Sequence, residues 1–194
     1  MAVRLPAAER RVQLLDAALS VFAAEGFQTA TMEAVATEAG VTKPVLYQHF
    51  SSKRELFLEL LRSVGAGLTE AVGEATGAAD SGRDMVVDGF AAYFHFVADH
   101  PDEFRLLFGE GVRTDHEFAR ALADVEALLA DFIAALIDID ELTGRERLMF
   151  AHGILGLAES TGRHWIASGA EGDVDELAGR VADLAWLGLR GRRP

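Results

Sequence analysis

The chain contains no cysteine and only four prolines among its 194 residues. Without cysteine it can form neither a disulfide framework nor a thiolate metal site. No apolar run approaches the length that spans a bilayer, and the first residues lack the hydrophobic segment of a signal peptide. We therefore expect a cytoplasmic protein with no part in the membrane.

Short motifs of the common enzyme classes are also missing. The chain has no G-x-S-x-G, P-loop, G-x-G-x-x-G or H-E-x-x-H. Asp99, His100, Asp102 and Glu103 are of metal-ligating types, but they stand at a predicted helix end, where capping and solvated charge explain them better. We expect no enzyme, no cofactor and no metal, with an exchangeable metal at His100 or His116 as the minor alternative.

Positive charge is scarce. The net charge is −13, yet the first 62 residues hold seven Lys and Arg against seven Asp and Glu, so the acidic excess belongs to the rest of the chain. An acidic body repels DNA except where a basic patch faces it. Such a protein should bind DNA of arbitrary sequence weakly and depend on specific contacts. The cations of the first part include Arg4, Arg10, Arg11, Lys43, Lys53 and Arg54.

What the sequence does contain is helical periodicity. Apolar residues recur every three or four positions and no stretch shows strand alternation, which predicts an all-α protein. After a short arm over 1–6 we predict helices over 7–25, 31–39, 42–49 and from 52 onward, with a loop over 75–82. Further helices are predicted over 84–99, after Pro101, and over 115–137, 143–167 and 173–189.

Residues 29–61 carry the pattern around which the rest is organised. Thr31 can cap a short helix, and Gly40 follows it where a left-handed backbone is needed. Thr42 can cap a second short helix, in which Pro44 occupies the first turn, where its missing N–H costs nothing. Two short helices joined by a tight turn around a glycine form a helix-turn-helix unit.

The second of these short helices would present two faces. Leu46 and Phe50 share one face and can pack against Val35 and Val41, while the other is polar. Gln48 can pair with adenine, Lys43 can reach guanine, and Pro44 and Val45 can touch a thymine methyl group. The side chains suited to phosphate oxygens are those of Tyr47, His49, Lys53, Thr31 and Thr42. Taken alone, this segment could equally be an ordinary helical turn with a core phenylalanine.

The full run AVATEAGVTKPVLYQHFSSKRELF resembles the DNA-binding signature of TetR-type (TetR/AcrR) transcriptional regulators, densely over 35–56 and loosely back to Arg10. The resemblance implies hydroxyl contacts to the DNA backbone from Thr31 and Thr42, and phosphate contacts from Tyr47, His49 and Lys53. It implies base reading by Lys43, Val45 and Gln48. Pro44 stands where many members have glycine, so no backbone N–H is offered there.

By the same resemblance, residues 1–53 form the helix-turn-helix DNA-binding domain and residues 54–194 a helical ligand-binding and dimerisation domain. The expected function is a homodimeric repressor, released from a palindromic double-stranded operator by a small apolar ligand of unknown identity. The alternative is a constitutive DNA-binding or scaffolding dimer that has no inducer.

The second part of the chain is dense in aromatic residues. They are compatible with core packing, but a helical bundle lined with them could also hold an apolar ligand. The candidate ligand-binding residues are Phe90, Tyr93, Phe94, Phe104, Phe118, Phe132, His152 and Trp165. By the family resemblance the last two helices form a dimer interface, for which the candidates are Ile154, Leu157, Trp186 and Leu189; burial within their own subunit fits these four equally well.

Overall fold

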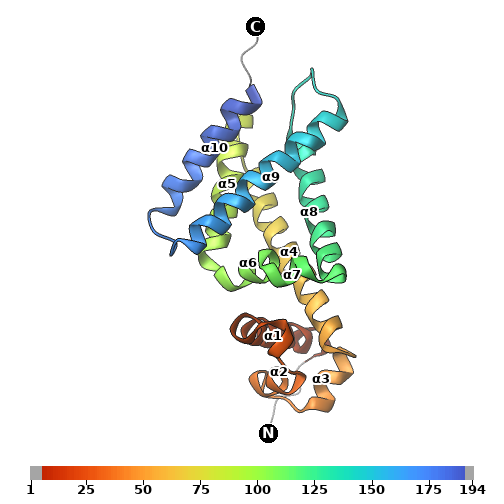
Figure 1. Cartoon of the computed structure of the whole chain (residues 1–194). Helices are drawn as coiled ribbons and strands as arrows, with labels where there is room; N and C mark the ends of the chain where they lie inside the picture. Colours follow the sequence, from red (N-terminus) through yellow and green to blue (C-terminus); the bar gives the residue numbers. More distant parts are fainter. Residues whose placement is uncertain (1–5, 191–194) are drawn as a thin grey trace. The chain divides into compact units, whose positions relative to one another are not determined.

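The computed structural model describes residues 6–190, and Arg4 with most of the predicted arm lies outside this range. Within it every regular element is a helix, so the all-α prediction is confirmed (Figure 1). The elements are α1 (Ala7–Thr29), α2 (Met32–Glu38), α3 (Lys43–His49), α4 (Lys53–Gly77), α5 (Gly82–Asp99), α6 (Pro101–Phe108), α7 (Glu110–Thr114), α8 (His116–Leu136), α9 (Gly144–Ala167) and α10 (Val174–Arg190). None of these helices is both long and apolar enough to cross a bilayer.

The chain divides into two compact units that interleave along the sequence. Unit 1 comprises Met1–Val64 and Asp102–Leu122, and unit 2 comprises Gly65–Pro101 and Ala123–Pro194. Unit 1 therefore contains α1 to α3 together with α6, α7 and the beginnings of α4 and α8. The functional division at residue 53 remains a proposal, because compactness alone does not define where a function ends.

Local signals set the helix ends of the helix-turn-helix as predicted. The Thr31 hydroxyl accepts a hydrogen bond from the Ala34 N–H at 3.1 Å and so caps α2. Gly40 has φ 64° at the end of α2, and Gly26 has φ 74° where α1 bends. Both positions need the left-handed backbone that glycine adopts without a steric penalty.

Thr42 precedes α3, but its side chain does not cap the helix. The reason is the lack of a suitable donor. Pro44 has no N–H, and the Val45 N–H already donates to the Thr42 carbonyl at 2.9 Å. The expected side-chain cap at Thr42 is therefore wrong, although the helix begins where the sequence predicted, and the Thr42 hydroxyl stays exposed beside α3.

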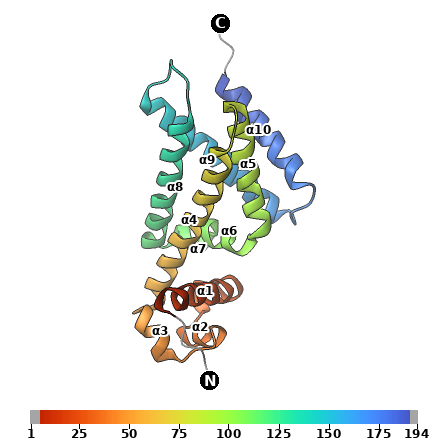
Figure 2. The same ribbon diagram turned by 180° about the vertical axis from the view of Figure 1, so that it is seen from behind.

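A compact apolar core holds the three N-terminal helices together. Leu14, Val35, Leu46 and Phe50 are fully buried, as the spacing of apolar residues predicted. Figure 2 shows α1, α2 and α3 gathered into one bundle. Burying a side chain of this size contributes roughly 1.5–3 kcal/mol, so this core orients α3 firmly.

The other part of unit 1 joins this bundle through aromatic packing. Phe118, at the start of α8, lies 4.7 Å from the Phe27 ring and 4.5 Å from the Phe57 ring, measured between centroids. Phe22 contacts Phe57 edge-on at 5.0 Å. We call these four residues the aromatic cluster. It ties segments about ninety positions apart into one unit, a contact that helical periodicity does not predict.

Unit 2 is a helical bundle in which α10 lies along α5, as both ribbon views show (Figures 1 and 2). Within it α4 and α8 approach each other closely at Gly65. A Cβ atom at that position would lie 2.6 Å from a methyl carbon of Val125, so the glycine makes this approach possible. The α8–α9 loop ends in a capping box between Thr143 and Glu146, which starts α9 where the sequence predicted.

Candidate DNA-binding surface and internal cavity

The predicted DNA-contacting residues lie together on one face of α3 and beside it. Thr42, Lys43, Pro44 and Gln48 are exposed, and Tyr47 keeps 49% of its surface open to solvent. Val45 and His49 are half-buried at the edges of this face, and Thr31 is exposed at the start of α2. Since Leu46 and Phe50 fix the opposite side of the helix, α3 presents a polar surface suited to a major groove.

Five cations of this unit already have partners within the protein. The Lys43 ammonium lies 2.7 Å from a Glu33 carboxylate oxygen, and Arg10 donates to the Gln13 side chain at 2.6 Å. Arg11 stacks on the Phe50 ring, donates to the His49 carbonyl at 3.2 Å and pairs with Glu59. The other two are Lys53 and Arg54.

Lys53 was predicted to contact phosphate, and the structure places it differently from the α3 residues. Its ammonium donates to the carbonyls of Phe27, Gln28 and Ala30 at 2.6, 3.2 and 2.7 Å. These carbonyls lie at the end of α1, where a cation is favoured by the helix dipole. All three donors of Lys53 are occupied, so a phosphate contact would require one of these bonds to break.

Arg54 forms an ion-pair site that sequence reasoning missed. Its guanidinium donates to both carboxylate oxygens of Asp115, at 2.9 and 2.8 Å, and to Glu117 at 3.0 Å. The same group stacks over the Phe118 ring at 4.7 Å. The Arg54 guanidinium lowers the pKa of Asp115 to about 2, with help from the N–H groups of Phe118 and Glu117. No sequence signal pairs residues 61 positions apart.

Unit 2 contains a cavity of about 1200 Å³. It is lined by residues of α4, α5, α8, α9 and α10 and by the α8–α9 loop: Val72, Thr76, Gly82, Met85, Val86, Gly89, Phe90, Tyr93, Leu129, Ile133, Leu136, Ile137, Asp138, Ile139, Asp140, Glu141, Ile154, Leu155, Ala158, Trp186 and Leu189. Most of this lining is apolar. The volume is at the upper end of ordinary small-molecule pockets, which measure roughly 300–1,000 Å³.

Two of the predicted ligand-binding residues, Phe90 and Tyr93, line this cavity. Burial raises the pKa of Tyr93, which keeps its phenol neutral. The Thr76 hydroxyl donates to the Val72 carbonyl at 2.8 Å. Three acidic residues of the α8–α9 loop, Asp138, Asp140 and Glu141, supply the charged part of the lining.

The other ligand candidates lie elsewhere. Phe94 is buried in the core of unit 2, while Phe104 and Phe118 are buried in unit 1. Phe132 is half-buried and His152 is exposed. Trp165 is buried and donates its ring N–H to the Glu171 carbonyl at 2.9 Å. These residues share the helical spacing of the cavity-lining ones, so periodicity could not separate the two groups.

The four dimer candidates also divide. Ile154, Trp186 and Leu189 line the cavity, whereas Leu157 is half-buried and lies outside it. The most exposed large apolar side chains of α9 and α10 are different ones, namely Met149, Phe150, Leu184 and Leu187. Leu184 and Leu187 are three positions apart and therefore share a face of α10, with 62% and 71% of their surfaces exposed.

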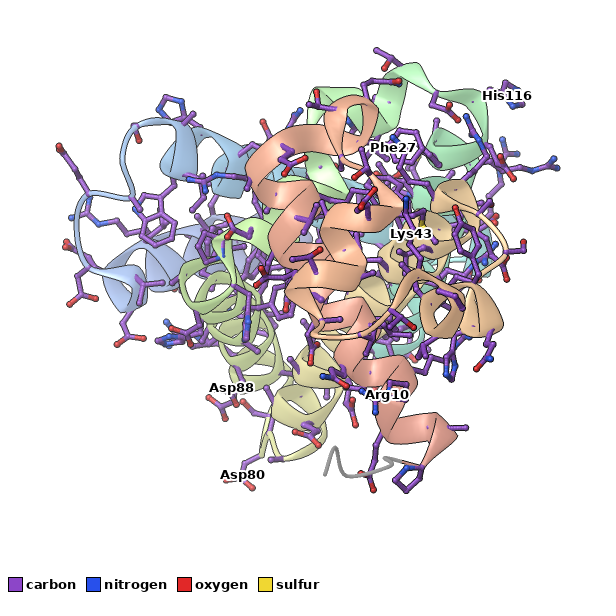
Figure 3. The ribbon with its side chains drawn as sticks, turned by 90° about the horizontal axis from the view of Figure 1, so that it is seen from below. Arg10, Phe27, Lys43, Asp80, Asp88 and His116 are labelled. Carbon is purple, nitrogen blue, oxygen red and sulfur yellow. The ribbon has the colours of Figure 1, made fainter. Side chains whose placement is uncertain are left out.

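Within residues 6–190 no group of three or more His, Asp or Glu side chains could hold a metal ion. His116, one of the two histidines considered for an exchangeable metal, is exposed and projects from the periphery in Figure 3. The arrangement therefore offers a groove-sized polar helix face in one unit and an apolar cavity in the other. Such a combination defines a helix-turn-helix protein with a chamber for a small molecule.

Comparisons with known proteins identify the family. Residues 14–60 match the model of bacterial regulatory proteins of the tetR family, and residues 83–188 match a tetracyclin repressor-like C-terminal domain. The chain is 34% identical to the HTH-type transcriptional activator FasR of Mycolicibacterium smegmatis over 187 residues, which are 96% of this chain and 85% of FasR. The chain belongs to the TetR family and is a DNA-binding transcriptional regulator.

Solved structures agree with this assignment. A TetR-like transcriptional regulator from Rhodococcus sp. RHA1 has a TM-score of 0.77 and 30% identity, covering 97% of this chain and 100% of that one. FadR from Bacillus subtilis, solved in complex with stearoyl-CoA, has a TM-score of 0.79 at 17% identity and covers 90% of this chain and 96% of that one. At that identity the second likeness concerns the fold alone. The family consists of transcriptional regulators rather than enzymes.

Proposed function

We propose that the protein is a homodimeric repressor that reads a palindromic operator and is released from it by an apolar ligand. The observation that carries this proposal is the exposed face of α3, with Lys43, Tyr47 and Gln48 directed to solvent over a fully buried Leu46. Two such helices, one from each subunit, would enter successive major grooves about one helical turn apart. No catalytic role is proposed for any residue.

Activation is the second candidate. It is favoured by the name of FasR, a transcriptional activator at 34% identity. Repressor and activator use the same DNA-binding surface and differ in where the operator lies relative to the promoter. A reporter assay with the natural operator decides between them: expression that rises when the regulator is deleted supports repression, and expression that falls supports activation.

The cavity supports an amphiphile with a long hydrocarbon chain as the ligand. Its volume of about 1200 Å³ and its mostly apolar wall suit a chain rather than a compact polar metabolite. FadR of Bacillus subtilis, which shares the fold, was solved with stearoyl-CoA. Because Asp138, Asp140 and Glu141 lie on one loop of the lining, a negatively charged head group would be placed away from that loop.

The first test is selection of bound DNA fragments by the full chain at about 150 mM salt, which suppresses non-specific electrostatic binding. Wild type should recover an inverted repeat. Tyr47→Ala should weaken binding to all sequences, because a phosphate contact is lost. Gln48→Ala should cost about 1–3 kcal/mol and relax the preference at one base pair. Equal losses on all sequences for both variants would contradict this division of roles.

The second test concerns the cavity and uses stearoyl-CoA and stearate as probes in thermal unfolding. A ligand at about 100 times its dissociation constant stabilises the native state by roughly 2.7 kcal/mol. Ile133→Trp, which fills the cavity from α8, should abolish the shift, whereas Leu128→Trp, at an exposed position of the same helix, should preserve it. Silence across both probes and a range of other amphiphiles would favour the alternative of a constitutive dimer.

A further inference from the structure

The ion pair between Glu33 and Lys43 lies on the surface that faces DNA. Glu33 is in the first turn of α2 and Lys43 begins α3, so the pair bridges the two helices of the helix-turn-helix at 2.7 Å. Both side chains are open to solvent, with 72% and 49% exposed. Figure 3 labels Lys43 on this part of the molecule. Since the Thr31 hydroxyl already caps α2, the Glu33 carboxylate is not needed to cap that helix.

We propose that Glu33 is a specificity-determining residue, whose carboxylate competes with DNA for the Lys43 ammonium and thereby suppresses binding to arbitrary sequences. The bond to Lys43 holds the pKa of Glu33 below its ordinary value, so the competing group is ionised at neutral pH. Any phosphate or base acceptor that takes Lys43 must first displace this carboxylate.

The exchange replaces one anionic partner of Lys43 by another, so it yields little net electrostatic gain. The displaced carboxylate also remains beside the DNA backbone, where like charges repel. Both effects reduce the sequence-independent attraction that supplies most non-specific binding. Hydrogen bonds from Gln48 and its neighbours to the correct bases are not reduced, so the ratio of specific to non-specific affinity rises.

The other cations of the unit reinforce this reading. Arg11, Lys53 and Arg54 are each held by carboxylates or carbonyls of the protein. The helix-turn-helix therefore offers few uncommitted positive charges to DNA of arbitrary sequence. Of these pairs, only Glu33–Lys43 has a partner among the predicted base-reading residues, which makes it the one that bears on sequence choice.

The test is Glu33→Gln in the full chain, which keeps the shape of the side chain and removes its charge. Glu38→Gln is the matched control, because Glu38 is exposed near the end of the same helix, away from the Lys43 pair. Affinity for a random-sequence duplex of about 30 base pairs is measured by fluorescence anisotropy from about 50 to 200 mM salt. Thermal unfolding of each variant checks that it is folded.

Glu33→Gln should raise non-specific affinity by about three- to tenfold at the low-salt end and steepen the salt dependence by about one phosphate contact. Glu38→Gln should change it by less than about twofold. In a Lys43→Gln background the effect of Glu33→Gln should disappear. Equal gains from the two glutamine variants, or a gain that persists without Lys43, would reduce the effect to net charge and overturn the proposal. So would a loss of operator affinity with unchanged non-specific binding, which would mean that Glu33 reads a base directly.

Discussion

Phe118→Ala should lower the free energy of unfolding by about 3–5 kcal/mol, the usual cost of truncating a buried phenylalanine. The ring is 1% exposed and contacts Phe27, Phe57 and the Arg54 guanidinium. No cavity-lining residue belongs to unit 1, so the loss should fall on stability rather than on ligand binding. Urea unfolding at a fixed protein concentration measures it, because dimerisation couples stability to concentration.

Leu128→Ala on the same helix is the control. Leu128 keeps 66% of its surface exposed, so its truncation should change stability by no more than about 0.5 kcal/mol. If Phe118→Ala unfolded like wild type but lost the thermal shift with stearoyl-CoA, Phe118 would belong to the ligand site, as the sequence suggested, and the aromatic cluster would be dispensable.

The sequence predicted those features that depend on neighbours along the chain. Thr31, Gly40 and Thr143 mark helix ends by local chemistry, and each helix end lies where they indicated. The exposed face of α3 followed in the same way, because the burial of Leu46 and Phe50 leaves only one side of a seven-residue helix to solvent. Local rules therefore described the candidate DNA surface nearly in full.

The features that sequence reasoning missed depend on contacts between distant segments. Phe90 and Phe118 look alike in the sequence, yet one lines the cavity and the other packs beneath the helix-turn-helix. Lys53 has the spacing of a phosphate contact, but the end of α1 folds back to its ammonium and occupies it. A residue's partner on another helix decides such cases, and periodicity carries no information about that partner.

The same limit applies to the dimer surface, where Trp186 and Leu189 line the cavity and the exposed apolar side chains are Leu184 and Leu187. Solvent-exposed leucines on one helix face indicate an interaction surface when they form a patch with others. Phe150 on α9 adds to the exposed apolar surface of the last two helices. We therefore propose that the homodimer forms through this face.

Leu187→Glu should convert the dimer to a monomer, because two copies of a symmetric interface would each bury an unpaired carboxylate. Operator affinity should then fall by about 10²- to 10⁴-fold, since the second half-site is no longer bound intramolecularly. Analytical ultracentrifugation gives the oligomeric state, and anisotropy on the selected operator gives the affinity.

Leu128→Glu, at a similarly exposed position on α8, is the control and should leave both the dimer and operator binding intact. Leu187→Ala provides a second variant in case the separated subunit does not fold: it should raise the dimer dissociation constant while the protein remains folded. A Leu187→Glu protein that stayed dimeric with full operator affinity would show that α10 faces solvent in the assembly. The apolar face of the last two helices would then need a different partner.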